Sequence, residues 1–409
     1  MARGLGLTAY RALSWRLPQE DAAPPLPRPE GPLLWAHAAS ADRYLALCDL
    51  TARVRSLRPG LNLLVTLARD AAETLPTGPG IATQRIAGDH PESVRRFLDH
   101  WRPDVGIWAG GALQPNLITA AADRAVPLIL ADLGEGDLAQ RALRWLPDLS
   151  RACLSRFEVI LAHSSAAAAQ LRKLGLPGDR ITVTSRLRTG ASPPPCPDSL
   201  LSEVTETLAG RPVWLATGVL AAETADLVTA HRDALRLLHR LLLVAIPRGP
   251  EDYDRLVEML NATGLRHVTW SEGEAIDDNT QVLISCSPET LGLWYRVAPL
   301  SFLGSSLVPG ARGLNPLDAA ALGSAVLYGP QVDDHREAYS RLTAEGAARL
   351  VRDGAGLGQA VTRIIAPDQA ARMALAGWQV VTEGAHLTDT LAELIHDRLD
   401  RREAPDADA

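Results

Sequence analysis

The most informative segment reads Phe302-Leu-Gly304-Ser305-Ser306-Leu-Val-Pro309-Gly310-Ala-Arg312-Gly313-Leu314-Asn315-Pro316-Leu317-Asp318. Glycines and serines lead from an apolar run to Asn315 and Asp318 at the start of the apolar helix Ala319–Leu322. A helix N-terminus with such an approach binds phosphate through its free N–H groups, and a nearby carboxylate accepts hydrogen bonds from ribose hydroxyls. Because Asn and Asp also cap helices, a nucleotide site and a plain helix cap are both open here.

Similar strand-to-helix units run along the whole chain. The apolar runs of the first half are Leu33–His37, Asn62–Thr66, Val105–Trp108, Pro127–Ala131, Glu158–Ala162 and Ile181–Thr184. Those of the second half are Pro212–Thr217, Leu241–Ile246, His267–Trp270, Gln281–Ser285, Leu300–Leu303 and Ala325–Tyr328. Helix-like stretches between such runs predict an α/β protein with two Rossmann-like, doubly wound parallel sheets.

A proline-rich segment, Ser185–Ser202, separates the two series and excludes a regular helix or a central strand. The length of 409 residues also fits two domains. We predict a first domain at 1–190, a linker at 191–203, a second domain at 204–400 and a disordered tail at 401–409. The ligand is expected in the cleft between the domains, near the carboxyl ends of the strands.

Composition and the absence of known motifs exclude several classes of function. A formal net charge of −7 argues against a nucleic-acid partner. The sequence shows no apolar stretch of membrane-spanning length and no signal peptide, so we expect a cytoplasmic protein. No P-loop, zinc-peptidase motif or nucleophile elbow is present, and no cofactor or metal is expected.

The first residues form a short amphipathic pattern. Apolar and basic side chains alternate there, namely Leu5, Leu7, Tyr10, Leu13 and Trp15 with Arg3, Arg11 and Arg16. Two interpretations are open: the segment lies on an anionic membrane surface, or it packs on its own domain.

Three further motifs carry weaker signals. The turn from His37 to Arg43 follows the first strand, where backbone N–H groups can face a ligand or Ser40 and Asp42 can cap a helix. Arg248, at the end of a second-domain strand, suits a phosphate as well as a surface salt bridge. Gly354-Ala-Gly356-Leu-Gly358 is interpreted as a loop, because no βαβ context or downstream acid supports a dinucleotide site.

The order of motifs from Leu33 to Leu399 resembles that of the transferases of 3-deoxy-D-manno-octulosonic acid (Kdo). The matching segments are 94–104, 115–117, 154–157 with 161–162, 212–216, 247–248, 291–299 and 304–330. The resemblance implies a GT-B fold and transfer of Kdo from CMP-Kdo to a lipid A precursor, peripherally on the cytoplasmic face of the inner membrane. It assigns the CMP site to Pro247, Arg248, Pro288, Glu289, Thr290, Asn315, Pro316, Leu317 and Asp318.

Departures from the family pattern fall where the family carries out its chemistry. Its Ser-Val-Gly-Glu motif, with glutamate as general base, here reads Ser40-Ala-Asp42-Arg43, and arginine cannot act as a base. Its Glu-Ser-Glu-Leu-Trp-Pro-Asn segment reads Gly110-Gly-Ala-Leu-Gln-Pro-Asn116, which removes two carboxylates. Further differences are Leu220 and Leu314 for histidines, Thr290 for a glutamate, and one residue inserted near Ala311 or Arg312.

These differences leave three hypotheses. In the first, a divergent Kdo transferase uses Asp42, one position from the usual base, to activate the acceptor hydroxyl. In the second, a catalytically impaired paralogue binds nucleotide or lipid A precursor and partners an active transferase. The third keeps the fold but changes the reaction, as in nucleotide-sugar epimerases, and the donor motifs count against it.

Overall fold

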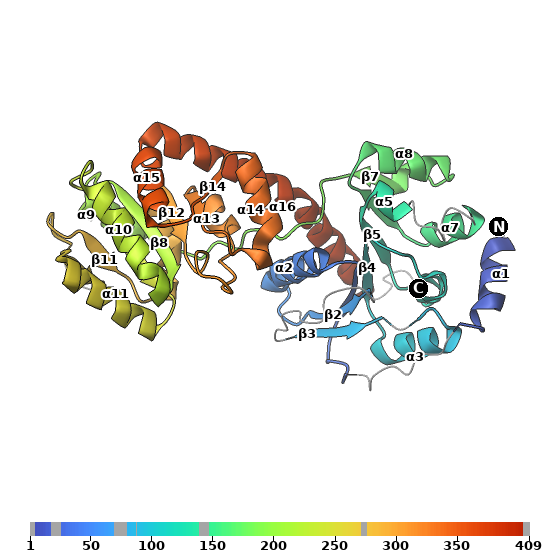
Figure 1. Cartoon of the computed structure of the whole chain (residues 1–409). Helices are drawn as coiled ribbons and strands as arrows, with labels where there is room; N and C mark the ends of the chain where they lie inside the picture. Colours follow the sequence, from blue (N-terminus) through green and yellow to red (C-terminus); the bar gives the residue numbers. More distant parts are fainter. Residues whose placement is uncertain are drawn as a thin grey trace. The chain divides into compact units, whose positions relative to one another are not determined.

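The computed structural model describes residues 5–17, 26–68, 80–86, 88–138, 147–270 and 276–403. It divides into two compact units, residues 1–190 with 384–409 (unit 1) and residues 191–383 (unit 2). Each unit is built around a seven-stranded sheet whose paired strands all run parallel, with helices packed on it (Figure 1). This confirms the predicted pair of doubly wound α/β domains.

The sheet of unit 1 has the strand order β3-β2-β1-β4-β5-β6-β7. Its strands are β1 (Leu33–Ala38), β2 (Asn62–Leu67), β3 (Ile81–Arg85), β4 (Val105–Ala109), β5 (Leu128–Leu133), β6 (Val159–Ala162) and β7 (Ile181–Val183). Its helices are α1 (Leu5–Ser14), α2 (Ala41–Leu57), α3 (Pro91–Trp101), α4 (Pro115–Asp123), α5 (Glu135–Leu138), α7 (Pro147–Leu154), α8 (Ser165–Lys173) and the end of α16 (Pro367–Glu403).

Alternating residues of each strand supply two separate cores. Leu33 and Trp35 pack with apolar side chains of α3, α4, α7 and α8. Leu34 and Ala36, on the other face, pack with α2 and the end of α16. A period of two along a strand buried on both faces produces this division.

The sheet of unit 2 has the order β10-β11-β9-β8-β12-β13-β14. Its strands are β8 (Val213–Val219), β9 (Leu242–Pro247), β10 (His267–Thr269), β11 (Val282–Ile284), β12 (Leu300–Leu303), β13 (Ala325–Tyr328) and β14 (Ala348–Leu350). Helices α10 (Thr224–Leu235), α11 (Pro250–Thr263) and α15 (Gly354–Ile364) contribute to one core. Helices α9 (Asp198–Leu208), α12 (Leu291–Val297), α13 (Leu317–Ala321) and α14 (Arg336–Ala344) contribute to the other.

Beside the first strand of each sheet lies a switch point, where the chain crosses from strands on one side of that strand to strands on the other. In unit 1 the chain runs from β1 to β2 and β3, then returns to place β4 on the other side of β1. In unit 2, β9 to β11 lie on one side of β8 and β12 lies on the other. Ligands of doubly wound sheets bind at the carboxyl ends of the strands beside this point, so the loops after β1, β4, β8 and β12 define where to look.

The predicted domain boundaries need correction at the C-terminal end. Residues 384–400 were assigned to the second domain, but residues from Gly384 onward belong to unit 1. The reason is a stripe of leucines at four-residue spacing in α16, which are buried in a core of unit 1: Leu387, Leu391 and Leu399, with Ile395 completing the spacing. Residues 401–403, placed in the tail, continue the helix, and 404–409 lie outside the described residues.

The linker prediction is also wrong in its second half. Helix α9 begins at Asp198, inside the segment predicted as 191–203, directly after Pro197. Val204 and Leu208 of this helix are buried in a core of unit 2. A proline that precedes a helix is compatible with its start, so the proline-rich stretch ends in a helix that belongs to the fold.

The glycine-rich segment at 354–358 is a helix, not a loop. Asp353 caps α15, with its carboxylate accepting the Gly356 N–H at 2.7 Å. A Cβ at Gly354 would lie 2.6 Å from the main-chain oxygen of Asp226 in α10. The glycines therefore allow α10 and α15 to approach closely, a packing requirement that overrides their weak helix propensity.

Two edge strands were not predicted, β3 and β14. The sequence of β3 is Ile-Ala-Thr-Gln-Arg, with no fully buried residue, and β14 has three residues. Edge strands carry fewer apolar residues than central ones, which removes the pattern used for prediction.

The amphipathic segment at the start packs on its own unit, with α1 beside α7 (Figure 1). The Tyr10 hydroxyl donates to Asp89 Oδ2 at 2.9 Å, and Asn116 Nδ2 donates to Ser14 Oγ at 2.8 Å. Leu13 and Trp15 nevertheless stay 59% and 63% exposed. Of the described helices, none has the length and apolar character needed to cross a bilayer.

Candidate functional site

The side chain of Arg43 lies at the switch point of unit 1 and pairs there with two acids. Ser40 caps α2 by accepting the Arg43 N–H at 3.4 Å, which places Arg43 in the first helical turn after β1. The Arg43 Nε donates to Asp132 Oδ2 at 2.7 Å. Its Nη2 donates to the Asp132 main-chain oxygen at 3.0 Å and to Asp137 Oδ2 at 3.3 Å. The guanidinium is thus held by two carboxylates, one near the end of β5 and one in α5.

Two glycines after β4 make room for this ion pair. Gly110 has a φ of 62°, and a Cβ there would lie 2.3 Å from Arg43 Cζ. Gly111 has a φ of 76° and donates its N–H to Asp137 Oδ1 at 2.7 Å. Only glycine adopts this backbone without strain and leaves the space empty. Arg43 fits here only because position 110 is a glycine, so the arginine at position 43 and the loss of the family's carboxylate at position 110 depend on each other.

The position assigned to the general base is occupied by a fixed cation. Burial alone would lower the pKa of Arg43, but the charges of Asp132 and Asp137 outweigh burial and raise it. A guanidinium that stays protonated cannot accept a proton from a hydroxyl. Asp42, the candidate base, is exposed in the first turn of α2, and within the described part of the chain its carboxylate has no hydrogen bond or ion pair.

His37, at the end of β1, is a structural residue. Its ring is buried, lies 4.0 Å from that of Trp108 between centroids, and has Nδ1 3.2 Å from Thr66 Oγ1. Desolvation by burial lowers the pKa of His37 to about 3, with the bond to Thr66 opposing the shift. The ring is therefore neutral at physiological pH.

The donor motifs of unit 2 begin at the carboxyl end of β9. The Arg248 N–H donates to the main-chain oxygen of Val219 at 3.0 Å, so Arg248 stands directly beside the end of β8. Its side chain is exposed and makes no hydrogen bond or ion pair with any residue that the structure describes. Pro247 is the last residue of β9. Arg248 thus offers a free guanidinium beside the switch point.

The second donor motif, Pro288–Thr290, forms a short 3₁₀ turn after β11. Thr290 Oγ1 lies 2.8 Å from Ser285 Oγ and donates to the Ser287 main-chain oxygen at 2.7 Å. Glu289 is exposed. Since β11 is next to β9 in the sheet, this turn and Arg248 share one edge of unit 2.

The third donor motif, Asn315–Asp318, starts α13. Asn315 Oδ1 accepts the Leu317 N–H at 3.0 Å, while Pro316 and Leu317 are buried. Asp318 Oδ1 accepts the Ser192 N–H at 2.7 Å. Burial raises the pKa of Asp318, and the bond from Ser192 opposes this. Pro316 and Leu317 therefore serve packing, and one oxygen of Asp318 is committed to the start of unit 2.

The glycine-serine loop after β12 binds a carboxylate of the protein itself through its N–H groups. The carboxylate of Glu223, which follows β8, is completely buried and accepts the N–H groups of Ser305, Ser306 and Leu307 at 2.7, 2.9 and 2.9 Å. The switch point of unit 2 is thus also occupied by a side chain of the protein. These three loop N–H groups are therefore not free to bind phosphate, because they already have an acceptor, whereas the predicted phosphate site at the start of α13 stays a prediction.

Three acids that build these arrangements were not predicted: Asp132, Asp137 and Glu223. Asp132 follows the predicted strand Pro127–Ala131 directly, Asp137 lies six residues after it, and Glu223 lies six residues after the predicted strand Pro212–Thr217. Acids just past strand ends were the available signal. A one-dimensional pattern does not reveal that their partners lie 89 and 82 positions away.

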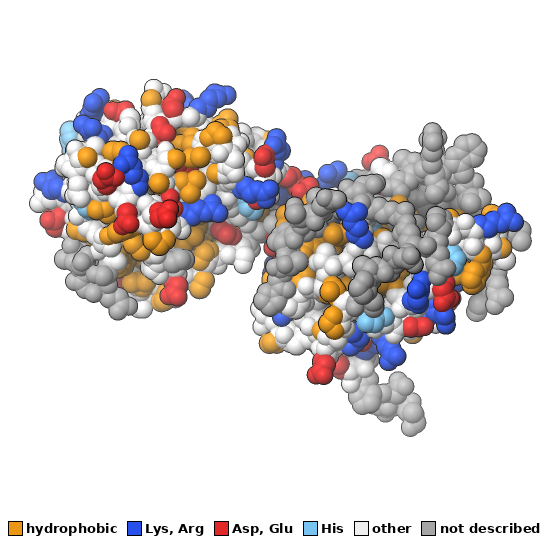
Figure 2. All heavy atoms as spheres, turned by 60° about the horizontal axis from the view of Figure 1, so that its bottom comes forward, with side chains coloured by type: hydrophobic (Ala, Val, Ile, Leu, Met, Phe, Trp, Pro, Cys, Tyr) orange, Lys and Arg blue, Asp and Glu red, His pale blue; other side chains and the backbone are white. Residues whose placement is uncertain are grey.

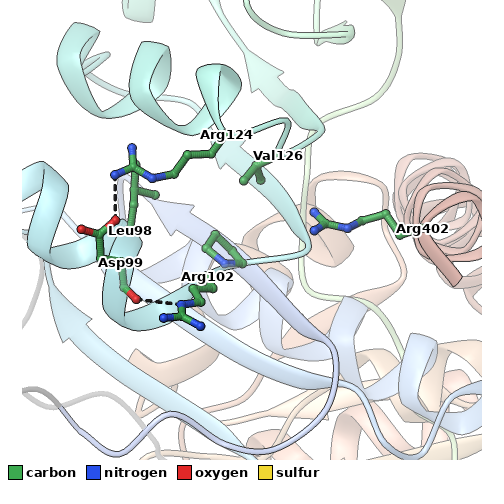
Figure 3. A pocket seen from close by; sticks show the side chains of 7 residues that line it. Leu98, Asp99, Arg102, Arg124, Val126 and Arg402 are labelled. Atoms are coloured by element: carbon green, nitrogen blue, oxygen red, sulfur yellow. Dashed lines mark hydrogen bonds and ion pairs between the residues drawn. The ribbon is translucent and has the colours of Figure 1, made fainter.

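A hollow of about 280 Å³ in unit 1 lies far from these loops, at the amino ends of β4 and β5 (Figure 3). Arg102, Arg124 and Arg402 line it, with Asp99. Arg124 pairs with Asp99 at 2.8 Å and Arg102 Nε donates to the Asp99 main-chain oxygen at 3.1 Å. Arginines commonly bind carbonyls at helix C-termini, so this hollow belongs to the scaffold.

Among the described residues, no group of three or more His, Cys, Asp or Glu side chains is placed to hold a metal ion. On the face drawn in Figure 2, arginines and acids are interspersed.

Comparisons with known proteins agree with the motif order. Residues 14–191 match the family model described as 3-deoxy-D-manno-octulosonic-acid transferase (kdotransferase). The 3-deoxy-D-manno-octulosonic acid transferase of Haemophilus influenzae is 24% identical, over 92% of this chain and 88% of the relative. That of Bordetella pertussis is 27% identical, over 80% and 78%.

Solved structures were matched as well. The MurG structure of Acinetobacter baumannii is 16% identical, with a TM-score of 0.46 over 90% of this chain and 100% of that one. The C-terminal CMP-Kdo binding domain of WaaA from Acinetobacter baumannii is 22% identical, with a TM-score of 0.39 over 47% of this chain and 98% of that domain.

The fold of two doubly wound units, each with loops gathered at a switch point, is that of a GT-B glycosyltransferase. Within this class, the first half of the chain matches the Kdo transferase family model, and relatives that align over most of the chain are named Kdo transferases, so the chain is similar to Kdo transferases.

Restoring the family's glutamate at position 43 should destabilise unit 1. The Arg43→Glu variant places a third carboxylate between Asp132 and Asp137, so we expect a loss of about 3–5 kcal/mol in the free energy of unfolding at neutral pH. Denaturant unfolding followed by circular dichroism measures it. The difference in the free energy of unfolding between variant and wild type should become smaller as the pH falls through the range in which carboxylates protonate.

The matched control is Arg95→Glu, which reverses an arginine in an exposed pair with Glu92. It should leave the unfolding midpoint near that of the wild type. If Arg43→Glu were as stable as the control, the ion pair would not hold the switch point of unit 1.

Proposed function

We propose that the protein transfers Kdo from CMP-Kdo to a lipid A precursor in lipopolysaccharide biosynthesis. The observation that carries the proposal is the free guanidinium of Arg248 at the carboxyl end of β9, beside the switch point of unit 2. A planar guanidinium that has no hydrogen bond or ion pair among the described residues suits the phosphate of a nucleotide sugar. The similarity of the chain to Kdo transferases supports CMP-Kdo as that nucleotide sugar.

The donor would be held along one edge of unit 2. Arg248 binds the phosphate, the Pro288–Thr290 turn borders the nucleotide, and the second oxygen of Asp318 accepts from a ribose hydroxyl. Asn315 orients the start of α13 through its bond to Leu317. These assignments follow the family motif position by position.

The acceptor would be activated in unit 1. The acceptor hydroxyl oxygen bonds to the sugar's anomeric carbon as the bond from that carbon to the CMP phosphate oxygen breaks. Asp42 takes the hydroxyl proton and CMP leaves with the electron pair of the broken bond. Its exposed carboxylate at the first turn of α2 is free to approach a substrate.

A second candidate function is favoured by Arg43. Because a paired arginine fills the usual base position, the chain would bind nucleotide or lipid A precursor without turnover and partner an active transferase. The two candidates share the donor site and differ in catalysis.

Nucleotide binding is the first test. Calorimetric titration with CMP should show binding, with much weaker binding of UMP. Arg248→Ala should weaken CMP binding about 10–100-fold, because it removes a charge-assisted contact to phosphate. Arg232→Ala, which removes an exposed arginine of α10, is the control and should bind CMP like the wild type. CMP binding that survives Arg248→Ala unchanged would refute the assigned phosphate contact.

Sugar transfer decides between the two candidates. If Asp42 is the base, Asp42→Asn should slow transfer from CMP-Kdo to a lipid A precursor by about 10²–10⁴-fold. CMP affinity should not change, and Asp179→Asn, an exposed acid of unit 1, serves as control. Transfer by wild type that is unaffected in Asp42→Asn removes Asp42 from the mechanism. CMP binding with no transfer by wild type selects the non-catalytic paralogue.

Peripheral contact with the inner membrane is part of the same proposal. Leu13, Trp15 and Leu17 are exposed next to Arg11 and Arg16, a combination that suits an anionic lipid surface. Cosedimentation should be greater with vesicles containing anionic lipid than with zwitterionic ones, and should fall in Leu13→Ser/Trp15→Ser. Equal binding of variant and wild type would exclude this segment as the contact.

A further inference from the structure

The carboxylate of Glu223 is a buried anion held entirely by backbone N–H groups. Its Oε2 accepts from Leu220 at 3.0 Å and from Ser305 at 2.7 Å, and its Oε1 accepts from Ser306 and Leu307 at 2.9 Å each. The side chain is 0% exposed, and no ion pair is recorded for it in the described part of the chain. Successive N–H groups in a turn form a concave site for an anion, and Glu223 supplies that anion.

The loop around this carboxylate has a shape that it would not adopt unaided. Ser305 has a φ of 55°, a left-handed conformation that is rare for a residue with a side chain. Its Oγ donates to the Gly218 main-chain oxygen at 2.8 Å. A Cβ at Gly304 would lie 2.8 Å from that same oxygen and 3.0 Å from Glu223 Oε2. The hydrogen bonds to Glu223 offset the strain at Ser305. If the loop relaxed, the buried carboxylate would lose these donors, at a large cost in free energy.

This loop in turn supports the segments beyond it. The Ser305 main-chain oxygen accepts the Gly313 N–H at 2.8 Å, and the Ser306 main-chain oxygen accepts the Gln331 N–H at 2.8 Å. Ser306 Oγ also accepts the Gly329 N–H at 2.8 Å. Gly313 lies two residues before Asn315, so hydrogen bonds lead from Glu223 to the start of the donor motif at α13.

We propose that Glu223 is a positioning residue for the nucleotide site, one that fills the anion nest of the β12 loop and so fixes the segment that carries Asn315 and Asp318. Because Glu223 already fills the nest, the phosphate of the nucleotide does not bind there and instead contacts Arg248. This inference rests on the proposed function for its nucleotide, whereas the nest itself stands on the contacts of Glu223.

The test replaces Glu223 by glutamine, which has the same shape. One amide oxygen accepts from two of the four N–H groups, and the amide nitrogen faces the other two as a donor. In Glu223→Gln, hydrogen exchange at Ser305, Ser306 and Leu307 should accelerate about 10–100-fold, since part of the acceptor is lost. CMP should bind about 10–100-fold more weakly. Glu203→Gln, an exposed acid on α9, should change neither.

The two measurements separate the inference from the proposed function. If the wild type binds no CMP, the proposed function fails, and the exchange rates still test the nest. If exchange at the three amides is unchanged in Glu223→Gln, the nest is refuted. If exchange accelerates while CMP affinity is unchanged, the positioning role is refuted.

If the glutamine variant does not fold, a second variant that keeps the negative charge still tests the proposal. Glu223→Asp shortens the side chain by one methylene, so it should fold and show intermediate exchange rates and intermediate CMP affinity. Wild-type values for both in Glu223→Asp would overturn the proposal.

Discussion

The structure depends on one constraint that both units share. At the switch point of each sheet, a charged side chain that follows the first strand contacts a glycine-containing loop that follows the neighbouring strand. In unit 1 this side chain is Arg43, which lies over Gly110 and pairs with Asp132. In unit 2 it is Glu223, which lies against Gly304 and accepts three N–H groups of the following residues. A buried charge is stable only when its partners are complete, so each side chain fixes the loops around it.

The two arrangements differ in what they mean for chemistry. In unit 2, Glu223 occupies the N–H groups of the β12 loop, while Arg248 has no partner among the described residues and is proposed to hold the donor phosphate. In unit 1, Arg43 replaces the group that would accept the proton, and Asp137 bonds to Gly111 and thereby completes the closure. Binding of a nucleotide sugar and activation of an acceptor are therefore separable properties of this chain, and the second depends on Asp42.

Sequence patterns predicted the two sheets because central strands buried on both faces appear as short apolar runs, which here alternate regularly with helix-like stretches. They failed where a contact between distant residues decides the structure. Leucines at four-residue spacing carry the end of α16 back to unit 1, and Gly354 is in a helix because α10 approaches it. In the candidate site, the donor residues were found by motif, whereas Glu223 and Asp132 were missed because their roles lie in partners distant along the chain. The arrangement of the two units, and with it the cleft, stays a prediction.

The most direct test is a crystal structure of the protein with CMP. The account predicts that the phosphate contacts the Arg248 guanidinium, with the ribose near Asn315 and Asp318. The Glu223 carboxylate should stay on the N–H groups of Ser305, Ser306 and Leu307. A phosphate bound to those N–H groups, with Glu223 displaced into solvent, would contradict the account.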